Sequence, residues 1–190
     1  KFVGAIGIGK SYGDLKNQTS WILTNVTEFN NITDICIIER NYTLTRILNE
    51  NETLKEINNG FRKSKNKAWI ASPWVSAWLL NRKVNQKDAR LIVRLSNNSD
   101  IKITDFEKLK ELDCKGLWKV RCNENLHSKL YLFDDFGILG SSNLTSRGMG
   151  ISERPNVETS AIIENKKDLD DLEKRFLEIW RGSTPISEFS

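Results

Sequence analysis

The stretch His127–Asn143, read as HSKLYLFDDFGILGSSN, decides the fold and indicates where a functional site lies. Its apolar residues predict a strand over 126–133 and a returning strand over 136–139, joined by a turn at Asp134 and Asp135. The single histidine of the 190 residues is here, followed by a lysine two positions later and by small polar residues after the second strand. Polar groups at fixed places in an apolar segment favour a functional role for this stretch.

Strands and helices alternate along most of the remaining chain. Short apolar runs predict the strands, and apolar residues at helical spacing between them predict amphipathic helices. This alternation is typical of the α/β class, with a mixed β-sheet flanked by helices on both faces. We expect one domain over residues 1–190, in which residues 1–50 are an N-terminal extension or an edge of the same domain. The expected strands are 34–38, 68–71, 89–95, 118–122, 126–133, 136–139 and 157–163.

The helices are expected from the residues at their ends. Asn51 and Asn165 are expected N-caps, and Thr104 with Glu107 matches the capping-box pattern. Pro73 suits the first turn of a further helix. The residues expected on the buried face of that helix are Trp74, Ala77, Trp78 and Leu79.

Composition limits the class of protein. A chain with 38% hydrophobic and 28% charged residues is globular in character, and its net charge of +4 is compatible with an anionic partner or with an ordinary basic surface. Cys36, Cys114 and Cys122 are odd in number and irregularly spaced, so we expect no disulfide framework and a cytoplasmic location. No apolar run approaches the roughly 20 residues of a membrane span. A membrane partner is therefore not expected.

Two further patterns suggest other functions. Residues 4–11, GAIGIGKS, match the spacing of a phosphate-binding P-loop. Only three residues precede them and a poor helix start follows, so a Gly-rich strand and turn is the better interpretation. Cys114, Cys122 and His127 could be zinc ligands, but a CxxC pair and a fourth ligand are missing. We therefore expect neither a cofactor nor a metal ion.

The side chains of the central stretch suit a tetrahedral anion such as phosphate. The imidazole of His127 can act as a nucleophile or as an acid and base. Lys129 supplies a fixed positive charge, while Ser141 and Asn143 add neutral hydrogen-bond donors. Because the cation is a side chain, this chemistry needs no metal.

The pattern His127-x-Lys129, four residues, Asp134, six residues, Ser141, with Asn143 two positions further, resembles the HKD motif of the phospholipase D superfamily. The resemblance extends in outline from about Lys67 to about Trp180 and implies a phospholipase D-like α-β-α sandwich. It also implies roles for the site residues. His127 attacks phosphorus and forms a phosphohistidine, while Lys129 and Asn143 hold the phosphate oxygens with help from Ser141. Glu158, in the stretch Asn156-Val157-Glu158, orients the imidazole, and Asp134 is a structural partner.

A single histidine leaves the leaving-group oxygen without an acid, a role that family members give to the histidine of a second motif. We therefore expect a homodimer in which the active site is shared through the active-site face. Single-motif family members of this size are commonly nucleases. The resemblance thus predicts a metal-independent phosphodiesterase, specifically a DNA endonuclease that could be a restriction-type nuclease domain, with RNA as another substrate. The alternatives are a phospholipid hydrolase or transferase and a catalytically silent nucleic-acid-binding module.

Basic residues outside the motif are candidate contacts to the nucleic-acid backbone. Arg147 is the strongest candidate because it follows the motif directly. A basic run after residue 61 could equally be a solvated helix end, because the helix dipole favours cations there. The candidates are Arg147, Arg154, Arg62, Lys63 and Lys65.

Overall fold

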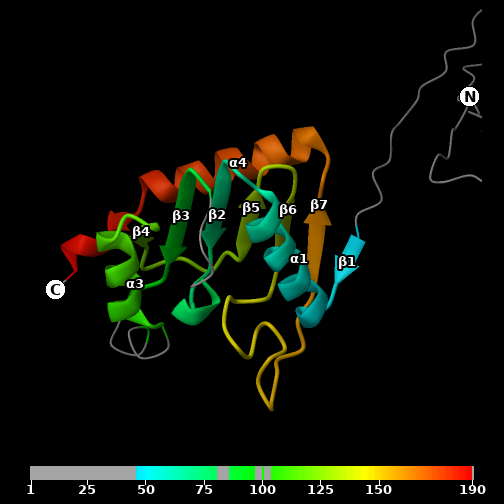
Figure 1. Cartoon of the computed structure of the whole chain (residues 1–190), viewed down its shortest axis with the longest axis horizontal. Helices are drawn as coiled ribbons and strands as arrows, with labels where there is room; N and C mark the ends of the chain where they lie inside the picture. The colour runs from blue at the N-terminus through cyan, green and yellow to red at the C-terminus, as the bar shows by residue number, and fades with distance from the viewer. Residues whose placement is uncertain (1–45, 81–85, 97–99, 101–103, 190) are drawn as a thin grey trace, which may run out of the picture. The chain divides into compact units, whose positions relative to one another are not determined.

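A mixed eight-stranded β-sheet is the centre of this computed structural model (Figure 1). The structure describes residues 46–80, 86–96, 100 and 104–189, so the P-loop-like segment, Cys36 and the strand expected at 34–38 lie outside the described residues. The strand order is β1-β7-β6-β5-β2-β3-β4-β8. Strands β2, β3 and β4 are parallel, and the other neighbouring pairs are antiparallel. The strands are β1 Arg46–Leu48, β2 Lys67–Ala71, β3 Asp88–Val93, β4 Lys119–Cys122, β5 Leu130–Phe133, β6 Gly137–Gly140, β7 Ser160–Ile163 and β8 Thr184–Pro185.

Helices cover both faces of this sheet, which confirms the predicted α/β architecture. Helix α4, Lys166–Arg181, packs on one face, and α1, Glu50–Lys63, and α3, Phe106–Cys114, pack on the other (Figure 1). Alternate residues of β5 therefore enter two different cores. Tyr131 and Phe133 pack with the α1 and α3 core, whereas Leu130 and Leu132 pack with Leu169 and Phe176 of α4. Two 3-10 helices complete the described elements, η1 Ala77–Leu79 and η2 Ile186–Glu188.

The start of α1 corrects one expectation. Its N-cap is Asn49, not Asn51, because the Asn49 side chain accepts from the backbone N–H of Glu52 at 2.9 Å. The Glu52 carboxylate accepts from the Asn49 N–H at 2.9 Å, which completes a capping box. The expected N-cap at Asn165 is confirmed, since its side chain accepts from the N–H of Asp168 at 3.1 Å.

The capping box expected at Thr104 and Glu107 is wrong. The N-cap of α3 is Asp105, and its side chain makes no bond within the helix. It accepts instead from the backbone N–H of Ala77 at 2.7 Å. The hydroxyl of Thr104 is buried without a hydrogen-bond partner among the described residues. A tertiary contact has therefore replaced the local cap.

The segment after Pro73 also differs from the expected helix. Val75 forms a parallel bridge with Leu144, and the N–H of Ser76 donates to the carbonyl of Leu144 at 2.8 Å. This pairing keeps the chain extended until the short turn of η1. The expected burial of Trp78 is wrong, because its side chain is 52% exposed. The pairing also joins the end of the His127–Asn143 stretch to the end of β2.

Two expected strands begin three or more residues later than predicted. Strand β5 begins at Leu130 rather than at residue 126, and β7 begins at Ser160 rather than at residue 157. The residues before each strand lie beyond the ends of the neighbouring strands. They therefore do not have a paired strand on each side. They form loops, and these loops carry the candidate site residues.

Candidate active site

The loops that carry the candidate residues meet at one edge of the sheet. Parallel strands β2, β3 and β4 all end there, β5 and β7 begin there, and β6 ends there. The carboxyl ends of parallel strands are the usual place for ligands in α/β sheets. The loops at this edge are 72–76, 94–96, 123–129 and 141–159, apart from the residues that lie outside the described ranges.

His127 and Lys129 lie together before β5. The imidazole of His127 is exposed, whereas the Lys129 side chain is only 6% exposed. The Lys129 ammonium donates to the His127 carbonyl at 2.8 Å and lies 3.3 Å from imidazole Nδ1. Loss of hydration lowers the pKa of Lys129; the charge of Glu158 opposes this, and that of Arg94 adds to it. The site thus holds a cation beside an accessible imidazole.

Strand pairing brings Ser141 and Glu158 to the same edge. The N–H of Gly140 donates to the Lys129 carbonyl at 3.3 Å, and the N–H of Ser141 donates to the Thr159 carbonyl at 3.0 Å. The Ser141 hydroxyl donates to the Glu158 carboxylate, whose other oxygen accepts from the Asn156 amide at 3.0 Å. These hydrogen bonds of Glu158 do not involve His127. An orienting role of Glu158 towards the imidazole therefore stays a prediction.

Asn143 is a buried polar side chain in the loop after β6. It is 8% exposed, and its Oδ1 atom has no hydrogen-bond partner among the described residues. The turn beyond it is tight, because a Cβ on Gly148 would lie 2.4 Å from the Asn143 carbonyl oxygen. Buried amide groups are nearly always paired. The unpaired Oδ1 atom is an acceptor, so a ligand would have to bind it through a hydrogen-bond donor, whereas a phosphate oxygen would need the Nδ2 donor.

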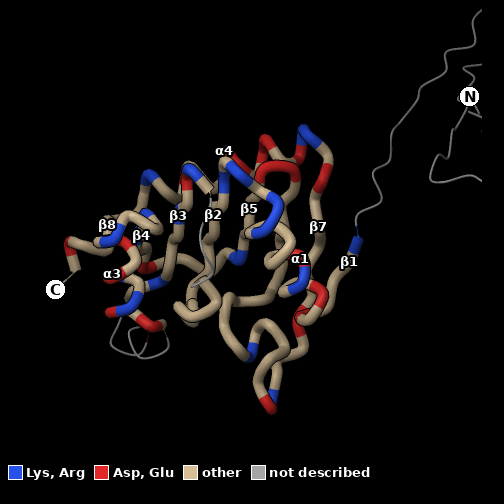
Figure 2. Tube along the Cα trace, in the orientation of Figure 1, with Lys and Arg blue, Asp and Glu red and all other residues tan. Residues whose placement is uncertain are grey.

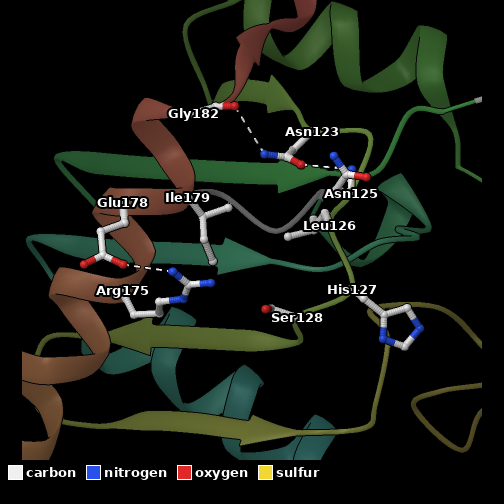
Figure 3. Close-up of a pocket in the computed structure, with 9 residues that line it drawn as sticks. All are labelled: Asn123, Asn125, Leu126, His127, Ser128, Arg175, Glu178, Ile179 and Gly182. Carbon is white, nitrogen blue, oxygen red and sulfur yellow. Dashed lines mark hydrogen bonds and ion pairs between the residues drawn. The ribbon is translucent and has the colours of Figure 1, made fainter.

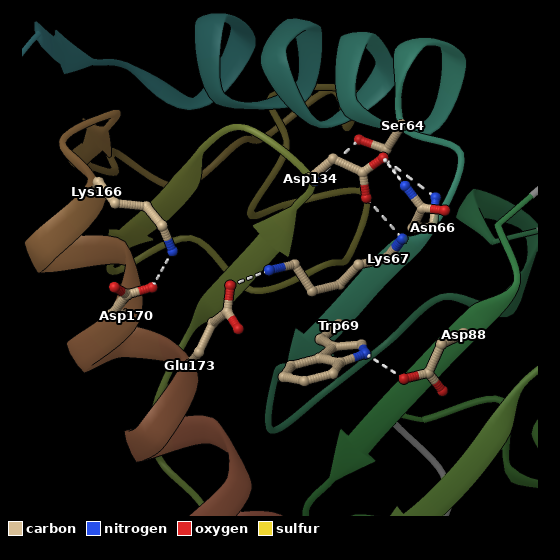
Figure 4. Close-up of polar contacts among 9 residues, drawn as sticks. All are labelled: Ser64, Asn66, Lys67, Trp69, Asp88, Asp134, Lys166, Asp170 and Glu173. Atoms are coloured by element: carbon tan, nitrogen blue, oxygen red, sulfur yellow. Dashed lines mark hydrogen bonds and ion pairs between the residues drawn. The ribbon is translucent and has the colours of Figure 1, made fainter.

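Asp134 lies at the other end of β5, away from His127. Its carboxylate accepts from the backbone N–H groups of Lys65, Asn66 and Lys67 at 2.8, 3.1 and 2.7 Å, and from the Asn66 amide at 3.2 Å (Figure 4). Desolvation alone would raise the pKa of Asp134, but these hydrogen bonds outweigh it and lower that pKa. Asp134 therefore anchors the start of β2 in this structure.

The five basic candidates fall into two groups. Arg147 and Arg154 are exposed in the loop between β6 and β7, which starts at the site edge. The others lie at or just after the C-terminal end of α1, next to Asp134 and at the opposite edge of the sheet (Figure 2). The structure thus brings two of the five near the loops of His127 and does not bring Arg62, Lys63 and Lys65 there.

A cavity of about 320 Å³ lies beside this segment, between residues 123–128 and α4. Figure 3 shows that the His127 imidazole points away from it, while the side chains of Ser128 and Arg175 face it. The cavity and the imidazole are thus on different sides of the chain segment. Arg175 already forms an ion pair with Glu178 at 2.9 Å.

The zinc interpretation gains no support from the structure. Cys114 is exposed in α3, and Cys122 is buried in β4, where desolvation and the charge of Asp113 raise its pKa to about 12. Within the ranges that the structure describes, no three His, Cys, Asp or Glu side chains are grouped as metal ligands.

Among the described helices, none is long and apolar enough to cross a membrane.

Sequence reasoning missed one group at this edge. Arg94 follows β3 directly and is held by the buried carboxylate of Asp100 and by Trp74. A cation placed immediately after a buried apolar strand is the signal that could have found it. Its partners, however, come from two separate loops.

The sheet, with these groups at the ends of its central strands, agrees with the phospholipase D-like domain that the His127–Asn143 pattern resembles. Residues 57–180 match the family described as "Cardiolipin synthase, PLD-like domain", and because this is well over half of the chain, the chain belongs to that family. A comparison with curated proteins found no match.

Solved structures show the same fold. NucT from Helicobacter pylori is 14% identical with a TM-score of 0.61, and the match covers 74% of this chain and 98% of that one. Nuc, a phospholipase D family member from Salmonella typhimurium, is 14% identical with a TM-score of 0.56, covering 74% and 96%. A phosphatidylserine synthase from Haemophilus influenzae is 18% identical with a TM-score of 0.56, covering 77% of this chain but 41% of that one.

Proposed function

We propose that this protein is a metal-independent phosphodiesterase that cleaves nucleic acid, with DNA as the first candidate substrate. The observation that carries the proposal is the exposed imidazole of His127 beside the buried ammonium of Lys129. A fixed cation next to a nucleophile stabilises the charge that develops on a phosphate oxygen during attack. The Asn143 amide supplies a second polar group for the same phosphate through its Nδ2 donor, since the unpaired Oδ1 is an acceptor and cannot bind a phosphate oxygen.

The reaction proceeds in two displacements. Attack on phosphorus by Nε2 requires the tautomer in which Nδ1 carries the proton, and because the Lys129 ammonium cannot accept that proton, its 3.3 Å approach to Nδ1 does not by itself select this tautomer. The P–O bond to the leaving group breaks, a phosphohistidine forms, and water then attacks the phosphohistidine to release the product and the free imidazole. Each displacement also needs a proton transfer, to the leaving oxygen in the first and from water in the second.

A second copy of the chain supplies that proton-transfer group. The chain has one histidine, and its imidazole is exposed rather than enclosed by its own protomer. A two-fold axis at the active-site face would bring two His127 side chains together, one as nucleophile and one as acid and base.

A phospholipid hydrolase or transferase is the second candidate. The family description, which names cardiolipin synthase, and the likeness to a phosphatidylserine synthase favour it. The His127 chemistry serves either phosphodiester, so the substrate decides between the two candidates.

The test is cleavage in EDTA. Wild-type protein and His127→Ala are incubated with plasmid DNA, RNA and phosphatidylcholine vesicles. We expect the wild type to cleave nucleic acid and the variant to lose all of that activity. Hydrolysis of the vesicles alone would establish the second candidate, and loss of wild-type activity in EDTA would exclude the metal-free mechanism.

Mixing the same two proteins tests the shared site. If each site needs both imidazoles, a dimer with one His127→Ala protomer is inactive. After denaturation and joint refolding, activity should fall as the square of the wild-type fraction. A linear fall, or a monomer in light scattering at the assay concentration, would show that each protomer works alone.

A further inference from the structure

Arg94 is a firmly held cation at the site edge, outside the His127–Asn143 stretch. Its guanidinium donates to both oxygens of Asp100, from Nε at 3.3 and 3.2 Å and from Nη2 at 3.1 Å. The Asp100 carboxylate is 1% exposed and also accepts from the Trp74 indole N–H at 3.0 Å. The guanidinium carbon lies 5.0 Å from the Trp74 ring centre. Two partners thus fix the plane of this guanidinium.

Its position places it near the catalytic cation. Arg94 follows β3, and Lys129 precedes β5, with β2 between them. Two strand spacings amount to about 9.5 Å between the backbones. Consistent with this, the charge of Arg94 helps to lower the pKa of Lys129. The Arg94 side chain is 25% exposed, and none of its hydrogen bonds to described residues uses Nη1.

The same kind of arginine, aspartate and tryptophan contact also occurs elsewhere on β3, away from the site edge. Arg90, four residues earlier on the same strand, is held in the same way by Asp88 at 2.9 Å and by the Trp69 ring at 4.6 Å. It lies at the far end of β3, where its guanidinium is also within 5.3 Å of the Trp180 ring centre. Arg90 is covered on two sides by aromatic rings, whereas Arg94 has one such ring and the site edge beside it. Arg90 is therefore a matched control.

We propose that Arg94, held by Asp100 and Trp74, binds the phosphate next to the scissile one in a nucleic-acid strand. This inference rests on the proposed nucleic-acid cleavage. It names the subsite by which the enzyme distinguishes a nucleic-acid strand from a substrate with a single phosphodiester. Lys129 meets the phosphate under attack, and Arg94 meets its neighbour with a guanidinium that is fixed before the substrate arrives. A phospholipid with one phosphate has no group for this subsite.

Substrates with one and with several phosphates test the inference. Arg94→Gln, Arg94→Lys and Arg90→Gln are assayed on bis(p-nitrophenyl) phosphate and on a single-stranded oligonucleotide. For Arg94→Gln we expect roughly a tenfold or greater rise in KM for the oligonucleotide, the effect of one charge-assisted contact, and an unchanged kcat/KM for the single diester. The folded fraction of Arg90→Gln should have unchanged KM and kcat/KM on both substrates.

Salt dependence supplies a readout that a purely structural role would not move. In a His127→Ala background, loss of Arg94 should reduce the slope of log binding constant against log salt by about 0.7 to 0.9, the value for one phosphate contact. Arg94→Lys, which keeps the charge but not the fork, should keep the slope with a smaller rise in KM. If Arg94→Gln does not fold, Arg94→Lys carries the test through the same contrast between substrates.

The outcomes separate the inference from the proposed function. Equal losses on both substrates, or no loss on either, would overturn the role of Arg94 while nucleic-acid cleavage by the wild type stands. A wild type that cleaves no nucleic acid overturns both.

Discussion

Lys129→Met is expected to abolish most activity while leaving the fold as stable as the wild type or more so. Lys129 is 6% exposed, and its ammonium is the cation proposed to bind the phosphate. Removing a group that stabilises developing charge typically lowers kcat by about 100- to 1,000-fold. Removing a poorly hydrated charge from a protein interior is often neutral or stabilising. Activity and urea unfolding, measured on the same preparation, test both halves.

The pH dependence of this effect has a defined sign. Because burial lowers the pKa of Lys129, the folded state disfavours the charged form. The penalty is full below the folded pKa and disappears as pH rises towards the ordinary lysine value of 10.5. The stability advantage of Lys129→Met should therefore shrink between neutral and alkaline pH. Lys119→Met, at a lysine whose side chain is 67% exposed, should change neither the activity nor the stability. A Lys129→Met protein that unfolds readily yet keeps normal specific activity would contradict the assignment.

Asp134→Asn is expected to cost about 2 to 4 kcal/mol of folding free energy with little effect on catalysis by the folded fraction. The carboxylate accepts four hydrogen bonds from residues 65–67. An amide at this position points a donor at one or more of those donors, which are then left unpaired. Urea unfolding of the variant measures the loss, and the cleavage assay separates this structural role from a catalytic one.

Because hydrogen bonding lowers the pKa of Asp134, its contribution is present above the unfolded pKa and is lost as pH falls through the folded pKa. The difference in stability between wild type and Asp134→Asn should therefore narrow in acid. The neighbouring Asp135 is exposed, and Asp135→Asn should change stability by less than about 0.5 kcal/mol. Equal effects of the two substitutions would contradict the anchoring role.

The sequence predicted the elements whose signals are local. The apolar residues of α4 recur at helical spacing, and those of β2, β3 and β5 form short apolar runs. Both patterns are visible in the sequence because each buried face needs apolar side chains. The segment after Pro73 was mispredicted because its partner, Leu144, lies far away in the chain. The cap of α3 was mispredicted for a similar reason, since the Asp105 side chain bonds to Ala77 instead.

The residues of the candidate site differ in the same way in whether the sequence alone can indicate them. His127, Lys129 and Asn143 could be proposed from the sequence because they lie in one continuous stretch with characteristic spacing. Arg94 was not found, because its partners Asp100 and Trp74 lie on separate loops. Which group the Glu158 carboxylate binds was equally beyond sequence reasoning, since this depends on the pairing of β6 with β7.

The link between Leu144 and the end of β2 has a consequence for folding kinetics. The Leu144 N–H donates to the Ser72 hydroxyl at 3.0 Å across a sequence separation of 72 residues. A contact that closes so long a loop forms only after considerable chain entropy has been lost. We therefore expect the loop that carries Asn143 to take its shape late, once β2 and β5 are paired. During synthesis, the local helices are expected to form before the candidate site does.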